Sequence, residues 1–266
     1  MHKPLTKNLA ASRKHTMPNL TQRWPLGLNR KNWPDFAAAL AGVLFVLVFF
    51  DAYVSQTLMA WPDAWKAPFA FVTDFGLSEW VLIPSLIVLI LSAIVVRLLP
   101  QGLYRRATHE AALVAGFIFV GVGLPGLAVN LLKRLFGRAR PELFIDTGMF
   151  QFQQVFNDWS FQSFPSGHST TAIGTAFVMG FMAPRYFRLI LLIAMMTGIS
   201  RVVIGMHYPT DVVAGFVIGA LGAYAIRNVF ARRRWLFADL PDGTVRFRGA
   251  PNLRKVWRRL FQRAAA

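Results

Sequence analysis

Three short groups of polar residues in this sequence have side chains that could bind and attack an oxyanion. In chain order they are Lys133, Arg140 and Pro141; Pro165, Ser166, Gly167 and His168; and Ser200, Arg201, His207 and Asp211. The chain has no cysteine. A thiolate nucleophile, a thiolate metal site and a disulfide are therefore excluded.

The three cations of these clusters are suited to an anion with several charged oxygens. Arg140 and Arg201 can each hold a phosphate through two N–H groups, and Lys133 adds a point charge. Ser166 and Gly167 come just before a predicted helix, so its first N–H groups and its dipole should face the same anion. A phosphoryl group fits such a site better than a carboxylate, because it accepts hydrogen bonds from many donors at once.

The two histidines supply the reactivity. Asp211 follows His207 by four residues, and its carboxylate can accept the Nδ1–H and leave Nε2 free to attack phosphorus. His168 would then protonate the departing alkoxide as the general acid. This division of roles predicts a phosphohistidine intermediate that water later hydrolyses. Because three cations can stabilise the transition-state charge, we expect no metal ion and no other cofactor.

Composition indicates the class of protein that holds these clusters. Of the 266 residues, 55% are hydrophobic and only 15% are charged, and the mean hydropathy is +0.43. A soluble domain this apolar would expose large apolar patches, so a membrane protein is expected. The formal net charge of +17 is concentrated at the two flanks, with seven Lys/Arg in 1–35 and ten in 231–266. Basic tails at a membrane surface explain this distribution better than nucleic-acid binding does.

Six apolar runs predict an all-α bundle of six transmembrane helices. They extend approximately over 36–50, 80–96, 111–132, 169–183, 189–205 and 211–230. The first run is short of the roughly 20 residues that a spanning helix needs. It reaches that length only if Asp51 lies at the membrane interface. Residues 1–35 show no conventional signal peptide.

Six spans place both termini on one side of the membrane. With both termini in the cytoplasm, the inner segments hold 23 Lys/Arg and the outer segments hold six, which favours this orientation. The chain then divides into a basic cytoplasmic segment (1–35), a catalytic membrane domain (36–230) and a basic cytoplasmic tail (231–266).

The basic tail contains a possible amphipathic helix. Its apolar residues recur at helical spacing between basic residues, and they are Leu253, Val256, Trp257, Leu260 and Phe261. Such a helix is typical of segments that lie on an anionic leaflet, and a solvated basic tail is the alternative.

In the six-span topology all three polar clusters fall at outer helix ends. Hydropathy and charge determine this topology without the clusters, so their convergence on one face independently supports a shared site. Four of the six outer cations lie in 133–140, against the usual charge distribution, and a bound anion would offset them. We expect a protein of the bacterial inner membrane whose site faces the periplasm or the exterior.

Together, the clusters resemble the three signature motifs of the type 2 phosphatidic acid phosphatase superfamily, which also includes bacterial acid phosphatases and vanadium haloperoxidases. The resemblance covers about residues 111–230. It implies that His207 is the nucleophile, Asp211 its partner and His168 the acid. It also implies that the phosphate ligands are Lys133, Arg140, Ser166, Gly167 and Arg201. The implied activity is metal-independent hydrolysis of a phosphate or diphosphate ester of an outer-leaflet lipid.

Several alternatives stay open at the level of sequence. The same intermediate could pass its phosphoryl group to another lipid, and a non-catalytic lipid-phosphate binder or transporter would need only the cations. A haloperoxidase is disfavoured by the six spans. The motifs do not distinguish phosphatidic acid, phosphatidylglycerophosphate, undecaprenyl pyrophosphate and lipid A as substrates. Arg138 could join the phosphate site or contact a headgroup, and the oligomeric state cannot be inferred.

Overall fold

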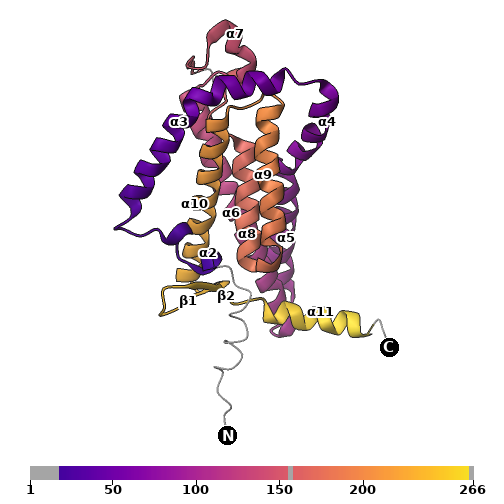
Figure 1. Ribbon diagram of the computed structural model, residues 1–266. Coiled ribbons are helices and arrows are strands. Elements are labelled where there is room, and N and C mark those ends of the chain that lie inside the picture. The colour runs from indigo at the N-terminus through magenta and orange to yellow at the C-terminus, as the bar shows by residue number, and fades with distance from the viewer. Residues whose placement is uncertain (1–17, 155–157, 264–266) are drawn as a thin grey trace.

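A computed structural model describes residues 18–154 and 158–263 as a bundle of long helices with a small β-hairpin at one end (Figure 1). The long helices are α3 (Trp33–Met59), α5 (Glu79–Leu98), α6 (Leu103–Phe136), α8 (Gly167–Met182), α9 (Phe187–Val203) and α10 (Pro209–Arg232). The shorter α-helices are α2 (Pro18–Thr21), α4 (Asp63–Val72), α7 (Phe144–Thr147) and α11 (Pro251–Arg263). Each of the six apolar runs predicted from the sequence therefore lies largely within a long helix.

Short 3-10 turns and one hairpin complete the described chain. The turns are η2 (Pro25–Gly27), η3 (Thr73–Gly76), η4 (Pro141–Leu143), η5 (Trp159–Phe161) and η6 (Pro184–Tyr186). Strands β1 (Phe237–Asp239) and β2 (Val245–Phe247) pair antiparallel, with Phe237 opposite Phe247. The all-α prediction therefore holds for the bundle, and this hairpin in the tail is the exception among the described residues.

Five stretches of the described chain are long and apolar enough to cross a membrane. They are Trp33–Met59, Asp63–Leu98, Leu103–Phe136, Pro184–Val203 and Pro209–Arg232. Helix α8 has only 16 residues, which is short for a spanning helix. Most of its residues are buried among α6, α9 and α10, because it lies at the centre of the bundle. The predicted fourth span, over residues 169–183, therefore stays a prediction.

Glycines on α10 allow it to pack directly on α8. A Cβ at Gly215 would lie 2.5 Å from the carbonyl oxygen of Ser166, and a Cβ at Gly219 would lie 2.5 Å from that of Thr170. Small residues at this four-residue spacing allow two membrane helices to approach backbone to backbone. The first turn of α8 is thereby held against the first half of α10.

One end of the bundle collects the termini of several helices. Helices α6 and α9 end there, and α8 and α10 begin there (Figure 1). The second half of α3 passes over this end, and Asp51 and Ser55 are its buried residues. Asp51 is fully buried in the protein, and its expected position at the depth of the membrane interface stays a prediction. The helix can therefore continue through it to Met59.

Candidate active site

The three polar clusters meet at this end of the bundle. Lys133 lies in the last turn of α6, and Arg201 lies in the last turn of α9. His168 is in the first turn of α8, and Asp211 is in the first turn of α10. His207 lies in the short connection between α9 and α10. Three clusters that are separate in the sequence therefore share one site.

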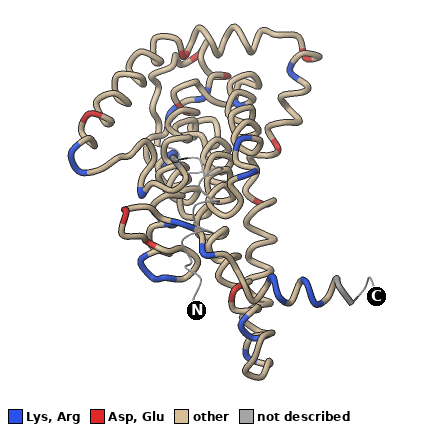
Figure 2. Tube along the Cα trace, turned by 60° about the horizontal axis from the view of Figure 1, so that its bottom comes forward, with Lys and Arg blue, Asp and Glu red and all other residues tan. Residues whose placement is uncertain are grey.

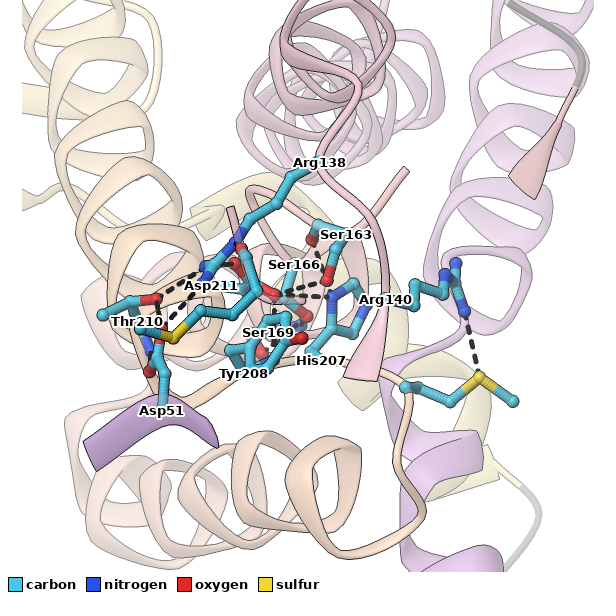
Figure 3. Close-up of polar contacts among 12 residues, drawn as sticks. Asp51, Arg138, Arg140, Ser163, Ser166, Ser169, His207, Tyr208, Thr210 and Asp211 are labelled. Atoms are coloured by element: carbon cyan, nitrogen blue, oxygen red, sulfur yellow. Dashed lines mark hydrogen bonds and ion pairs between the residues drawn. The ribbon is translucent and has the colours of Figure 1, made fainter. Parts of the chain in front are cut away.

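The imidazole of His207 is held in one tautomer. The ring is 3% exposed, and its Nδ1 lies 2.7 Å from the carbonyl oxygen of Ser163 (Figure 3). A carbonyl oxygen can only accept, so Nδ1 is protonated and Nε2 keeps its lone pair. Burial lowers the pKa of His207 to about 4, although the nearby Asp211 carboxylate opposes the shift. The ring is therefore neutral at neutral pH, as a nucleophile must be.

Asp211 supports His207 differently from the sequence prediction. Its Oδ2 is 3.6 Å from Nδ1 of His207, which is too long for a hydrogen bond. The fully buried carboxylate instead accepts from Oγ of Ser163 at 2.5 Å and from the backbone N–H of Tyr208 at 2.8 Å. Asp211 thus fixes Ser163, and the carbonyl of Ser163 fixes the histidine. It also lies close enough to stabilise a positive charge that develops on the ring.

Arg138 and Asp51 extend this network into the first long helix. The guanidinium of Arg138 pairs with Oδ1 of Asp211 at 2.6 Å and with Oδ2 of Asp51 at 2.9 Å. The other oxygen of Asp51 accepts the backbone N–H of Thr210 at 3.0 Å. Arg138 also stacks over the ring of Tyr208, at 4.2 Å from its centroid. Figure 3 shows these side chains converging from α3, the segment after α6, and the start of α10.

Neither role considered for Arg138 from the sequence is therefore its role in the structure. The side chain is 6% exposed and is neutralised by two carboxylates, so it is neither a free phosphate ligand nor a headgroup contact. A signal for this pairing was present in the sequence. Asp51 is an acid within an apolar run, and an ionisable residue inside a membrane helix generally requires a partner.

Arg140 and Arg201 have much weaker partners than Arg138. Nη1 of Arg201 donates to the hydroxyl of Thr73 at 2.8 Å. Nη1 of Arg140 contacts the sulfur of Met206 at 2.9 Å, and its guanidinium lies 4.7 Å from the centroid of a Trp159 ring. The Nε atoms of both arginines are buried and have no hydrogen-bond partner among the described residues. Because buried donors are normally satisfied, oxyanion oxygens would fit between them.

Ser166 and Gly167 lie where an anion would contact the first turn of α8. Ser166 is the N-cap residue of α8, and its Oγ accepts from Oγ of Ser169 at 2.9 Å. Because this oxygen acts as an acceptor, its own O–H proton remains available to donate. The backbone N–H of Ser166 is already committed to the carbonyl of Asp211, at 3.0 Å. Of the two residues, Gly167 is the one that can offer its backbone to an anion.

His168 and Lys133 line a cavity of about 380 Å³ between α5, α6 and α8. Its walls include the apolar side chains of Leu82 and Leu127. The cavity therefore combines a cation and a histidine with a surface that could contact hydrocarbon. This combination fits a phosphate that is attached to a lipid.

Comparison with known proteins places this site in a family. The sequence profile of the PAP2 superfamily matches residues 114–235, which contain all three polar clusters. A lipid A 1-phosphatase of Rhizobium johnstonii is 33% identical over 229 residues, covering 85% of this chain and 93% of that protein. The chain belongs to the PAP2 superfamily. A lipid A 1-phosphatase of Rhizobium etli is 35% identical over 201 residues, covering 76% of this chain and 86% of that protein.

A solved PAP2 structure is also similar. It is the transmembrane phosphatidylglycerolphosphate phosphatase of Bacillus subtilis, with 21% sequence identity and a TM-score of 0.49 over 73% of this chain and 96% of that one. The family profile and the two lipid A 1-phosphatase relatives confirm the resemblance inferred from the motifs. With its apolar helices, this PAP2 protein is an integral membrane lipid phosphatase, and hence a hydrolase.

The turn η3 is a part of this PAP2 site that sequence reasoning missed. Thr73 at its start holds Arg201, and Gly76 at its end lies against His168. A Cβ at Gly76 would be 2.8 Å from Cβ of His168 and 2.8 Å from Cγ2 of Thr197. Only glycine allows this approach without displacing its neighbours. In the sequence, this Thr-Asp-Phe-Gly stretch is indistinguishable from an ordinary turn, so it gave no signal.

Proposed function

We propose that this PAP2 protein hydrolyses a phosphate or diphosphate ester of an outer-leaflet lipid through a phosphohistidine intermediate, without a metal ion. The observation that supports this proposal best is the neutral His207, whose Nδ1–H is committed to the carbonyl of Ser163. Its Nε2 therefore keeps its lone pair near Arg140 and Arg201, whose Nε–H groups have no hydrogen-bond partner among the residues that the structure describes.

In the first step, Nε2 of His207 attacks phosphorus and forms a P–N bond while the bond to the lipid oxygen breaks. His168, which is protonated when the charge of the bound phosphate offsets the surrounding cations, gives this proton to the departing alkoxide. Lys133, Arg140, Arg201, the Ser166 hydroxyl and the Gly167 N–H bind the equatorial oxygens and stabilise their charge. The imidazolium character that develops on His207 is stabilised by Asp211.

In the second step, water attacks the phosphohistidine. His168, now neutral, takes a proton from the water, the P–N bond breaks, and inorganic phosphate leaves with His207 restored. Asp51 and Arg138 act as positioning residues in both steps, because they hold the Asp211 carboxylate and the start of α10.

The substrate favoured by the relatives is a lipid A with a phosphate at position 1. Two lipid A 1-phosphatases align with most of this chain, and the cavity that contains His168 has apolar walls suited to a lipid. Phosphatidic acid, phosphatidylglycerophosphate and undecaprenyl pyrophosphate are the competing substrates.

The proposed placement is a six-span protein of the bacterial inner membrane, with α8 as the short fourth span. Both termini lie in the cytoplasm, and the active site faces the periplasm. The distribution of basic residues supports this orientation. An accessibility tag inserted near Asp63 is expected to react from outside the cell. Protection of that tag, combined with accessible termini, would reverse the orientation.

Phosphate release by the purified protein in detergent tests the reaction. The panel would contain lipid A, phosphatidic acid, phosphatidylglycerophosphate and undecaprenyl pyrophosphate, each assayed in excess EDTA beside His207→Ala. We expect release that depends on His207 and is fastest with lipid A. Activity that needs added metal would overturn the metal-free mechanism, and wild-type turnover by His207→Ala would remove the nucleophile assignment.

The same assay distinguishes the two competing functions. Phosphate consumption that requires a second lipid as acceptor would identify a phosphotransferase. If the folded protein binds vanadate as a phosphate analogue but turns over no lipid with or without an acceptor, it is a non-catalytic binder.

A further inference from the structure

Helix α11 lies across the bundle axis at the end opposite the active site (Figure 1). Glu110 of α6 fixes where it starts. The carboxylate of Glu110 accepts the backbone N–H groups of Asn252 and Leu253, each at 2.9 Å, and the side-chain amide of Asn252 at 2.6 Å. Because a carboxylate satisfies the free N–H groups of a first helical turn, the bundle holds the start of α11.

The sequence of α11 separates into an apolar and a basic face. The apolar residues follow each other at intervals of three or four, and they are Leu253, Val256, Trp257, Leu260 and Phe261. Between them lie four cations, Arg254, Lys255, Arg258 and Arg259, and the helix contains no acidic residue. Figure 2 shows the positive charge along α11 where it extends from the bundle.

The apolar face of α11 is largely uncovered by the described protein. Trp257 is 63% exposed, Leu260 is 59% exposed and Phe261 is 55% exposed. The rings of Trp257 and Phe261 stack on each other at 4.1 Å rather than on the bundle. Large aromatic and aliphatic side chains gathered on one exposed helix face indicate a surface for an apolar partner.

The position of α11 along the bundle identifies that partner. The apolar part of α6 begins at Ala111, directly after the Glu110 that holds α11. The transmembrane stretches Asp63–Leu98 and Pro209–Arg232 also end at this end of the bundle. A bilayer that covers the apolar helices therefore has its surface at the level where α11 starts. Because α11 lies across the bundle axis (Figure 1), it would extend along that surface and not through it.

We propose that α11 lies in the headgroup layer of this leaflet, with its apolar face in the acyl boundary and its cations on anionic phospholipids. Four cations without an acid complement a negative lipid surface. The same charge disfavours a second copy as the partner, because two α11 helices would bring like charges together. This proposal does not depend on which lipid the active site hydrolyses.

Single-cysteine labelling can test the proposal, because the chain has no cysteine of its own. An environment-sensitive fluorophore is attached at Leu260→Cys on the apolar face or at Lys255→Cys on the basic face. Each protein is reconstituted into nanodiscs of phosphatidylcholine with or without phosphatidylglycerol. We expect a blue-shifted emission, protected from aqueous iodide, for Leu260→Cys in the anionic discs. Lys255→Cys should stay exposed to iodide.

The role of charge is tested on the Leu260→Cys background by changing Arg254, Arg258 and Arg259 together to glutamine. The ratio of inserted to withdrawn helix in anionic discs should fall about five-fold for each cation removed. The matched control changes the same three arginines to lysine, which retains the charge, and it should keep the insertion of the parent.

Three results would overturn the proposal. Equal iodide exposure at the two labels in anionic discs would show that the helix does not lie in the membrane. Equal insertion in neutral and anionic discs, unaffected by the glutamine changes, would rule out recognition of anionic lipid. A blue shift in detergent that grows with protein concentration would assign the apolar face to a second copy of the chain.

Discussion

The two ends of the bundle both bury arginines, but their guanidinium groups have different partners. At the end opposite the active site, Arg227 of α10 is fully buried. It donates to the backbone carbonyls of Leu20, Gln22 and Arg23 and to the side chain of Asn228, at 2.5–3.1 Å. It also lies over two aromatic rings, those of Phe181 and Tyr224, at 4.5 and 4.6 Å. Arg227 thus fastens the segment before α3 to the bundle.

At the active-site end the arginines are of two kinds. Arg138 is neutralised by two buried carboxylates. Arg201 makes one hydrogen bond to a neutral hydroxyl, and Arg140 contacts a thioether sulfur, which is a weak acceptor. An unpaired Nε alone does not distinguish the groups, because Arg227 has one too. The terminal nitrogens distinguish them: where these are saturated by protein the arginine is structural, and where they are not it is suited to a ligand.

The largest expected effect comes from removing the paired arginine. Arg138→Met leaves Asp51 and Asp211 buried without their counter-ion, which should lower the free energy of unfolding by roughly 3–5 kcal/mol. Hydrolysis should be lost as well, because Asp211 no longer holds its position. Denaturation in detergent and phosphate release measure the two effects.

A second variant separates the causes of that loss. Adding Asp51→Asn to Arg138→Met removes one uncompensated charge and should recover part of the stability without restoring activity. If Arg138→Met alone is as stable as the unmodified protein, the ion-pair network does not have the role assigned to it.

Changing a ligand-binding arginine should affect catalysis and leave folding intact. Arg201→Met should lower kcat by roughly 10²–10³-fold, which is typical of losing one donor to the transition-state charge. The thermal midpoint should not decrease, since the guanidinium makes a single hydrogen bond to the described protein. Arg201→Lys is the control that retains the charge but cannot bind phosphate bidentately, and its kcat should lie between those of the unmodified protein and Arg201→Met. A methionine variant with normal kcat would exclude Arg201 from the phosphate site.

Changing an arginine to methionine at the opposite end of the bundle should lower stability and leave catalysis unchanged. Arg227→Met removes the donors to three backbone carbonyls, and the free energy of unfolding should fall by roughly 3 kcal/mol. The kcat of the fraction that remains folded should stay close to that of the unmodified protein. A catalytic defect equal to that of Arg201→Met, measured on folded protein, would contradict the division between the two ends.

The smallest expected effect is a titration that does not occur. Burial lowers the pKa of His207 to about 4. Its neutral fraction should therefore fall by only about one tenth between about pH 7 and about pH 5, whereas the neutral fraction of an ordinary histidine would fall about 25-fold. Imidazole NMR spectra, with the signal assigned by its absence in His207→Gln, measure this directly. A midpoint near the ordinary value of about 6.5 would contradict the burial argument.

The lowered pKa of His207 also makes the free energy of unfolding depend on pH. Between the ordinary histidine pKa of about 6.5 and the folded value of about 4, the unfolded chain binds a proton that the folded chain does not. The contribution of His207 to stability is therefore fully present above this window, and it is lost as the pH falls through it.

The sequence predicted the long helices and the clusters that meet at one end, because apolar runs and residues with intrinsic reactivity are local features. His168, His207 and Lys133 could each be chosen from their own chemistry and neighbours. The partner of His207 could not be predicted, because it is the backbone carbonyl of Ser163, and a carbonyl has no side-chain signature. The pairing of Asp51 with Arg138 joins residues 87 positions apart and depends on how α3 crosses the bundle.

The ion pairs of Arg138 also have a consequence for the order in which the protein is made. Asp51 belongs to the first long helix, Arg138 follows the third, and Asp211 begins the last. A growing chain that has not yet inserted α10 lacks the carboxylate of Asp211, which holds both Ser163 and Arg138. Under the proposed mechanism, lipid hydrolysis then cannot begin on a partly inserted chain, and the membrane is exposed to this activity only after α10 has been made.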